Sequence, residues 1–149
     1  MIFLHFHRLN QIEQTIPETY IKRASQRLSI YKALGTINSV EELWDFRRGI
    51  EDRFGLIPET FLNIFRNREI RLWGQSFGVE SIEHKMNSLR IQFRDISRIN
   101  PEKLIKLLFE KERKLSYIPE DTIEIHNVPA EMISIIQGLK SLEKVFMSN

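Results

Sequence analysis

The apolar residues of this 149-residue chain change their spacing near Val79. Before that point they recur at every third or fourth position, which places them on one face of a helix. After it they alternate with polar residues, a pattern typical of a strand that is buried on one face. The change predicts an α+β fold, in which N-terminal helices pack on a small antiparallel sheet and a C-terminal helix follows.

The clearest helix is expected from about Val40 to Phe54. Ser39, followed three residues later by Glu42, forms a capping box in which each side chain satisfies the other residue's free backbone N–H. Gly55 fits the left-handed position that ends a helix, and Pro58 suits the first turn of the next one. The apolar residues of the predicted buried stripe are Leu43, Phe46, Ile50 and Phe54.

Other elements follow from the same patterns and from turn residues. A strand is expected from Ile2 to Leu9. Further helices are expected in three places: from a Ser25 cap to Gly35, with Leu28, Tyr31 and Leu34 buried; from Pro58 to about Phe77; and from Asn100-Pro101 onward. Antiparallel hairpins are predicted at residues 81–94 and 115–126. Pro129 opens the last helix, whose apolar stripe is Met132, Ile135, Ile136, Leu139, Leu142 and Phe146.

The composition is that of an ordinary globular domain, with 42% hydrophobic and 28% charged residues. The length suits a single domain covering 1–149, and the abrupt first strand indicates a fragment of a longer protein. No run approaches the roughly 20 apolar residues that span a bilayer. The absence of cysteine fits a reducing cytoplasm. We therefore expect a cytoplasmic protein without a membrane partner.

The sequence lacks the residue patterns of common catalytic sites. It contains no G-x-x-x-x-G-K-[ST] phosphate loop, and neither G-x-S-x-G nor H-E-x-x-H occurs. His5 and His7 could share a metal ion, but no third ligand is identifiable, so a surface or packed histidine pair is favoured. The residues alone predict a non-catalytic binding or regulatory module without a cofactor, and they leave its partner open.

The last turn of the helix at 40–54 has an unusual charge pattern. Glu51 and Asp52 lie where the helix dipole presents partial negative charge, whereas Arg53 is placed favourably there. Acidic side chains in this position are often simply solvated. The alternative is that they form a charged contact with a partner.

A second candidate surface is the outer face of the first hairpin, which carries Arg90, Gln92 and Arg94. These side chains are the best candidates for contacts with nucleic acid, and a solvated face that protects the sheet is the alternative. The balance of 22 basic and 20 acidic residues gives a net charge of +2. That balance is too even to predict binding to phosphate backbones, which requires clustered basic side chains.

Three stretches together resemble the C-terminal domain of bacterial transcription-repair coupling factor. The first is I-P-E-T-Y-I followed by R-L-S-I-Y-K-A-L, at residues 16–21 and 27–34. The second is G-I-E-D-R-F-G-L-I-P at 49–58, similar to a family pattern close to E-L-x-D-R-F-G-x-x-P. The third is I-R-L-W-G-Q-S-F-G-V at 70–79, and the order and spacing of all three match the family.

The resemblance implies a regulatory role within a large ATP-driven DNA translocase that removes stalled RNA polymerase and recruits nucleotide-excision repair. The motor of such proteins lies upstream of this domain. The family's C-terminal domain packs on the N-terminal repair module of the same protein and hides the surface that recruits the damage-recognition ATPase. Contacts with RNA polymerase and DNA are then expected only indirectly, through the parent protein.

The family's interdomain contact uses the acidic residue, Asp and Arg of E-L-x-D-R-F-G. Asp52 and Arg53 match the last two, whereas Gly49 replaces the acidic residue. Glu51 lies two positions further along, about 200° around the helix, so it cannot substitute from the same face. The resemblance therefore predicts an interdomain contact through Asp52 and Arg53, with Glu51 beside it. The alternative function is a nucleic-acid-binding module that uses the basic strand face at 90–94.

Overall fold

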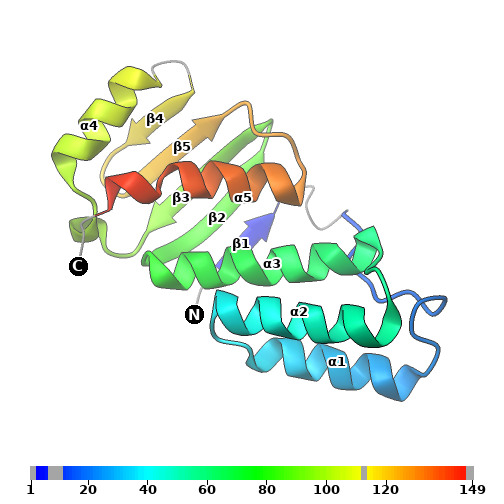
Figure 1. Ribbon diagram of the computed structural model, residues 1–149. Helices are drawn as coiled ribbons and strands as arrows, with labels where there is room; N and C mark the ends of the chain where they lie inside the picture. Colours follow the sequence, from blue (N-terminus) through cyan, green and yellow to red (C-terminus); the bar gives the residue numbers. More distant parts are fainter. Residues whose placement is uncertain (1–2, 7–11, 112–113, 147–149) are drawn as a thin grey trace. The chain divides into compact units, whose positions relative to one another are not determined.

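A computed structural model describes residues 3–6, 12–111 and 114–146 of the chain (Figure 1). The chain divides into two compact units, one made of Met1–Gln11 with Trp73–Asn149 and the other of Ile12–Leu72. We call the first the sheet unit and the second the helical unit. Helix α3 (Glu59–Ser76) begins in the helical unit and ends in the sheet unit. The mixture of helices and sheet confirms the predicted α+β class.

The helical unit is built from α1 (Ala24–Thr36), α2 (Val40–Phe54) and most of α3 (Figure 1). Their apolar faces meet in one core, in which Phe61 and Phe65 stack with ring centroids 5.1 Å apart. Leu43 and Ile50 are buried as predicted, whereas Phe46 and Phe54 are only partly buried against this core. The core consists of Ile16, Ile21, Ile30, Leu34, Ile37, Leu43, Ile50, Ile57, Phe61, Phe65 and Leu72.

The ends of α2 follow the local signals with one difference. Ser39 Oγ accepts a hydrogen bond from the backbone N–H of Glu42 at 3.1 Å, as an N-cap should. The Glu42 carboxylate accepts from the backbone N–H of Asn38 at 3.3 Å, one residue before the donor that a capping box uses. Gly55 has φ of 92° and ends the helix in a conformation that L side chains avoid.

The prediction for α1 was wrong in its cap and in its buried face. The helix begins at Ala24, its N-cap Arg23 makes no side-chain capping bond, and Gly35 lies inside it. Ile30 and Leu34 are buried one turn apart, whereas Leu28 is 54% exposed. Because R-L-S-I-Y-K-A-L carries apolar residues on more than one face, its spacing alone does not decide which face is buried.

The sheet has five strands in the order β1-β2-β3-β5-β4. The two predicted hairpins form its four antiparallel strands, and β1 joins one edge by pairing in parallel with β2. Residues 3–6 of the predicted first strand form β1, while the rest of that prediction, including His7, lies outside the described residues. The strands are β1 (Phe3–Phe6), β2 (Val79–Lys85), β3 (Ser88–Phe93), β4 (Leu115–Ile118) and β5 (Thr122–His126).

The turn of the first hairpin explains its tight register. Met86 and Asn87 both have positive φ, 52° and 59°, as the two central residues of a two-residue hairpin turn require. The register that results points Leu89 and Ile91 into the core, where neither is exposed to solvent. Alternation along β3 therefore predicted the buried face correctly.

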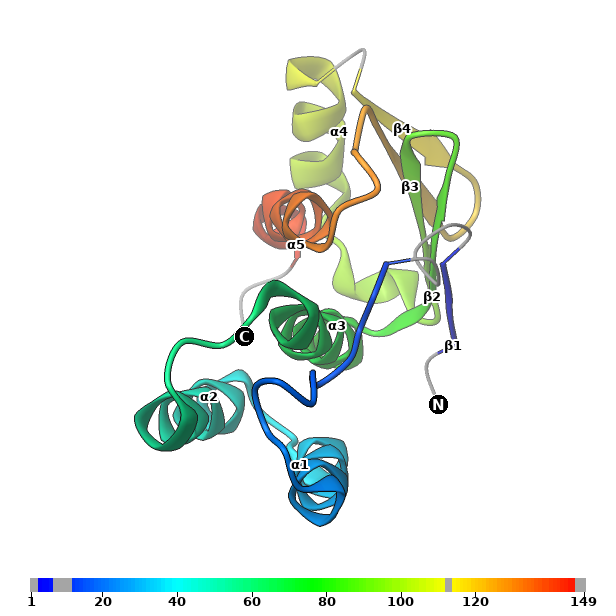
Figure 2. The same cartoon turned by 90° about the vertical axis from the view of Figure 1, so that its right-hand side faces the viewer.

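Helices α4 (Pro101–Glu110) and α5 (Met132–Ser141) cover one face of the sheet (Figure 2). Two short 3₁₀ helices, Ile96–Arg98 and Glu143–Val145, connect to them. The Asn100 side chain caps α4 by accepting from the backbone N–H of Lys103 at 3.2 Å, as predicted. The last helix begins at Met132 and not at Pro129 as predicted, and its stripe is buried at Met132, Ile135 and Leu139, while Ile136 is half-buried. Leu142 and Phe146 are also buried, but they lie beyond the end of α5.

Candidate functional site

The C-terminal turn of α2 exposes the two charged residues that the sequence singled out. The side chains of Asp52 and Arg53 are both exposed. Within the described part of the chain, Asp52 has no hydrogen-bond or ion-pair partner. The Arg53 guanidinium lies 4.9 Å from the centroid of the Phe54 ring, a cation–π contact that leaves its N–H donors available.

Glu51 has a different environment from its neighbour Asp52. Its carboxylate accepts a hydrogen bond from Arg47 Nε at 3.1 Å, one turn earlier on the same helix. It also lies near Tyr20, whose hydroxyl donates to the Gly55 carbonyl at 2.6 Å. Burial raises the pKa of the Tyr20 hydroxyl, and the charge of Glu51 raises it further. Glu51 therefore has contacts inside the helical unit that Asp52 lacks.

Phe54 is half-buried, although full burial was expected from the stripe. Its ring contacts Tyr20 with centroids 6.0 Å apart, and the Arg53 guanidinium lies over it. A residue in the last turn of a helix has no following turn to cover it, which explains the partial exposure.

Gly49 lies on the same side of α2 as Asp52 and Arg53, because residues three and four apart are neighbours on a helix surface. It is exposed, and a Cβ atom added there would meet nothing within 4 Å. No steric requirement of the helical unit therefore accounts for a glycine at this position.

Leu56 is the residue of this surface that the sequence analysis missed. It follows Gly55 directly, and its side chain is 90% exposed, the largest value among the exposed large hydrophobic residues. The next residue, Ile57, is buried, so two adjacent apolar side chains differ sharply in exposure. Because both residues are apolar, the sequence contains no signal that identifies Leu56 as the exposed one. We call Gly49, Asp52, Arg53 and Leu56 the α2-end surface.

The predicted basic strand face is largely occupied by internal contacts. Arg90 donates to Glu124 through Nε at 3.1 Å and Nη2 at 2.9 Å. Gln92 donates to the Asp121 carboxylate at 3.1 Å, and this bond together with one from Thr122 lowers the pKa of Asp121. Arg94 lies one residue beyond the end of β3. These contacts reduce the positive charge available to phosphates, and the nucleic-acid role stays a prediction.

The family model of the TRCF domain matches residues 10–104, a region that includes all three stretches singled out in the sequence. The chain belongs to the TRCF domain family. The resemblance to the C-terminal domain of transcription-repair coupling factor is thereby confirmed. The matched residues include the whole helical unit and the part of the sheet unit from Trp73 to Leu104.

Known relatives agree with this assignment. Transcription-repair-coupling factor of Haemophilus influenzae is 30% identical over 98 residues, which cover 66% of this chain and 9% of that protein. The protein of the same name from Borreliella burgdorferi is 27% identical over 129 residues, covering 87% of this chain and 11% of that protein. The chain thus spans about a tenth of the length of these relatives.

A solved structure is similar to this chain over nearly its whole length. The crystal structure of the C-terminal domain of a transcription-repair coupling factor superposes with a TM-score of 0.74 and 20% sequence identity. The match covers 97% of this chain and 94% of that one. At this identity the match shows a shared fold, including the sheet unit that lies mostly beyond the family-model match.

The described residues also bear on whether the chain holds a metal-ion site or a membrane-spanning helix. No group of three or more His, Cys, Asp or Glu side chains among residues 3–6, 12–111 and 114–146 could hold a metal ion. None of the helices in the described part of the TRCF domain has the length and apolarity needed to cross a bilayer.

Proposed function

We propose that this chain is the non-catalytic C-terminal regulatory domain, residues 1–149, of a longer transcription-repair coupling factor. In this proposal the α2-end surface docks on the N-terminal repair module of the same protein. Docking hides the surface that recruits the damage-recognition ATPase, so the resting protein does not start repair until the domain is released.

The observation that carries the proposal is the exposure of Asp52 and Arg53 at the two positions that match the family's contact motif. An acidic side chain in the last helical turn gains nothing from its own helix dipole. Asp52 also has no partner in the described part of its own chain. Both residues are therefore available to another surface.

Leu56 adds an apolar contact to this charged pair. A leucine that is 90% exposed leaves apolar surface in water. Burying such a side chain in a partner is worth roughly 1.5–3 kcal/mol. An interface with an apolar anchor beside exposed charges has the usual arrangement of a buried centre and a polar rim.

The proposal is tested by titrating the chain against the purified N-terminal module of its parent protein. Asp52→Ala/Arg53→Ala should weaken docking about tenfold or more, a loss of about 1.4 kcal/mol. Leu56→Ser should weaken docking without removing either charge. In the parent protein both variants should increase binding of the damage-recognition ATPase.

A matched control removes one acidic and one basic exposed side chain elsewhere in the helical unit. Lys32→Ala/Glu41→Ala should leave docking unchanged. Asp52→Ala/Arg53→Ala should also change the free energy of unfolding of the isolated chain by no more than about 0.5 kcal/mol, as expected for exposed sites. A stability loss of several kcal/mol, or docking equal to that of the control, would contradict the proposal.

A gain-of-function variant makes the test stricter. Gly49→Glu supplies the acidic residue of the family pattern, and the open space at this position accepts the side chain. Docking should become tighter for Gly49→Glu and stay unchanged for Gly49→Ala. Equal effects of the two substitutions would show that only helix stability, and no charged contact, is gained at position 49.

A further inference from the structure

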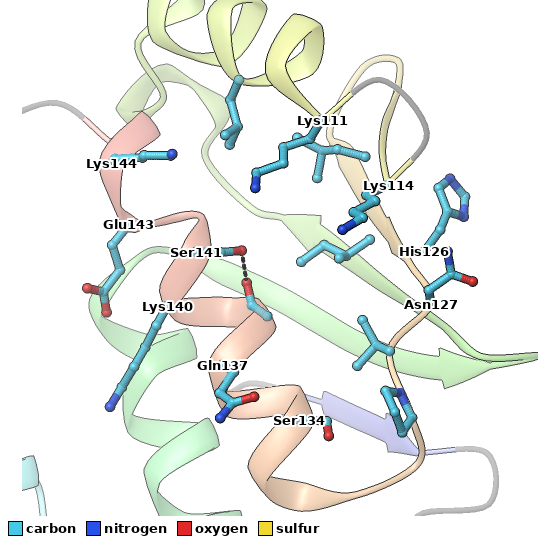
Figure 3. Close-up of a pocket in the computed structure, with 16 residues that line it drawn as sticks. Lys111, Lys114, His126, Asn127, Ser134, Gln137, Lys140, Ser141, Glu143 and Lys144 are labelled. Carbon is cyan, nitrogen blue, oxygen red and sulfur yellow. Dashed lines mark hydrogen bonds between the residues drawn. The ribbon is translucent and has the colours of Figure 1, made fainter.

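A groove in the sheet unit is separate from the α2-end surface. It has a volume of about 850 Å³ and lies between the end of α4, strands β4 and β5, and α5 (Figure 3). Its floor is apolar, since Leu107, Leu115, Ile125 and Val128 line it. All four of these side chains belong to the core of the sheet unit and are fixed in place by packing. The volume is within the range of roughly 300–1,000 Å³ that is usual for ligand sites.

The rim of the groove is positively charged. Lys111 extends over it from the end of α4, Lys114 from the residue before β4, and Lys144 from the segment that follows α5 (Figure 3). A smaller hollow of about 260 Å³ shares Leu107 and Lys144 with the groove and adds Lys103 and Lys106. The positive charge therefore continues along α4.

Few acidic groups neutralise these lysines. In the described part of the chain, the acidic residues that line the two hollows are Glu110 and Glu143. Glu143 accepts a hydrogen bond from Trp73 Nε1 at 3.0 Å, and Glu110 meets Lys144 at 3.8 Å in an exposed pair. Lys111 and Lys114 form no ion pair with a described residue. Exposed ion pairs of this kind contribute little to stability, so an incoming carboxylate can replace Glu110 at Lys144.

We propose that this groove binds a short acidic peptide segment of another protein, in which aliphatic side chains fill the apolar floor and flanking carboxylates meet the lysine rim. Exposed amide groups on Gln137 and Asn127 lie beside the floor, where they can bond to a peptide backbone. Charge complementarity sets the orientation and the rate of association, while burial of apolar area supplies affinity.

The lining favours a peptide over single-stranded nucleic acid. Proteins that bind single strands stack bases on aromatic side chains, in addition to their basic groove. No Phe, Tyr or Trp lines the groove in the described part of the chain. The imidazole of His126 is held by Ser88 at 3.2 Å and by Ser116 at 2.8 Å. An aliphatic floor without a stacking platform matches leucine or isoleucine side chains better than bases.

The test uses a twelve-residue synthetic peptide in which two leucines are flanked by Asp and Glu, titrated into the whole chain at about 50 mM salt. Binding should be saturable, should weaken at higher salt, and should shift the amide NMR signals of Leu107, Leu115, Ile125 and Gln137. An all-Glu/Ser peptide of equal charge should bind at least about tenfold more weakly, because it cannot fill the floor.

Two substitution pairs separate the groove from general charge attraction. Lys111→Glu/Lys114→Glu should weaken binding at least about tenfold, whereas Lys22→Glu/Lys32→Glu makes the same charge change on exposed residues of the helical unit and should have less than a twofold effect. Equal losses in both pairs, or equal binding of the two peptides, would overturn the proposal. Tighter binding of a single-stranded oligonucleotide of equal charge would assign the groove to nucleic acid instead.

Discussion

The helical unit and the sheet unit present their candidate surfaces in different ways. The α2-end surface comes from a single continuous stretch, Gly49 to Leu56, at the end of one helix. The groove combines α4, the strands β4 and β5, and α5, and its lining residues extend from Leu107 to Lys144. A short sequence motif can therefore reveal the first kind of surface, whereas the second exists only after the chain has folded.

The two units also differ in which elements supply the buried residues of their cores. Aromatic rings on α3 form the centre of the helical core, where Phe61 is fully buried and stacks on Phe65. Alternating strand positions supply much of the sheet core, with Ile91 fully buried on β3 and Phe93 in contact with Phe146 at a ring-centroid distance of 5.7 Å. Pairs of equivalent substitutions, one in each unit, can therefore compare the two units in their core residues, their glycines and their helix caps.

The largest effect is expected from truncating the cores. Phe61→Ala should lower the free energy of unfolding by about 3–5 kcal/mol, and Ile91→Ala by about 2–5 kcal/mol, because each leaves a cavity in a packed interior. Urea denaturation measures the loss, and hydrogen exchange should show the earliest loss of protection in α2 for the first variant and in β3 for the second. A loss below about 1 kcal/mol for Phe61→Ala would contradict an ordered aromatic core.

Glycine substitutions should have opposite signs in the two units. Gly49→Ala should raise the free energy of unfolding by up to about 1 kcal/mol, because an exposed helix glycine is replaced by the best helix former without steric conflict. Gly78→Ala should lower it by about 1–2 kcal/mol, since φ at this position is +68° and an alanine is strained there. Thermal unfolding of the two variants provides the measurement. Stabilisation by both would mean that Gly78 does not need its left-handed conformation.

The smallest effect is expected at the helix caps. Ser39→Ala in the helical unit and Asn100→Ala in the sheet unit should each lower the free energy of unfolding by about 1 kcal/mol, because each leaves a backbone N–H without its side-chain acceptor. Ser25→Ala is the matched control, since Ser25 lies inside α1 and caps nothing. Equal losses at Ser25 and Ser39 would show that serine in this unit has a role other than capping.

Elements whose signals are local could be predicted from the amino-acid sequence alone. Ser39 and Gly55 fixed the ends of α2, Asn100 fixed the start of α4, and alternation along β3 fixed which side chains face the core. The exposure of Asp52 and Arg53 was also predictable, because their angular separation from the buried stripe follows from helix geometry. Such features depend on residues within one or two turns of each other.

Tertiary structure decided the rest. The α1 stretch has apolar residues on two faces, and only packing selected Ile30 over Leu28 for burial. Strand β1 lies more than 70 residues from its parallel partner β2, a pairing that no local pattern specifies. The lysines of the groove come together because α4, the 3₁₀ helix Glu143–Val145 and the β4 hairpin converge on one end of the sheet unit. Contacts between residues far apart in the sequence form only if they lower the free energy of the whole packed unit. The local spacing of apolar residues does not specify such contacts.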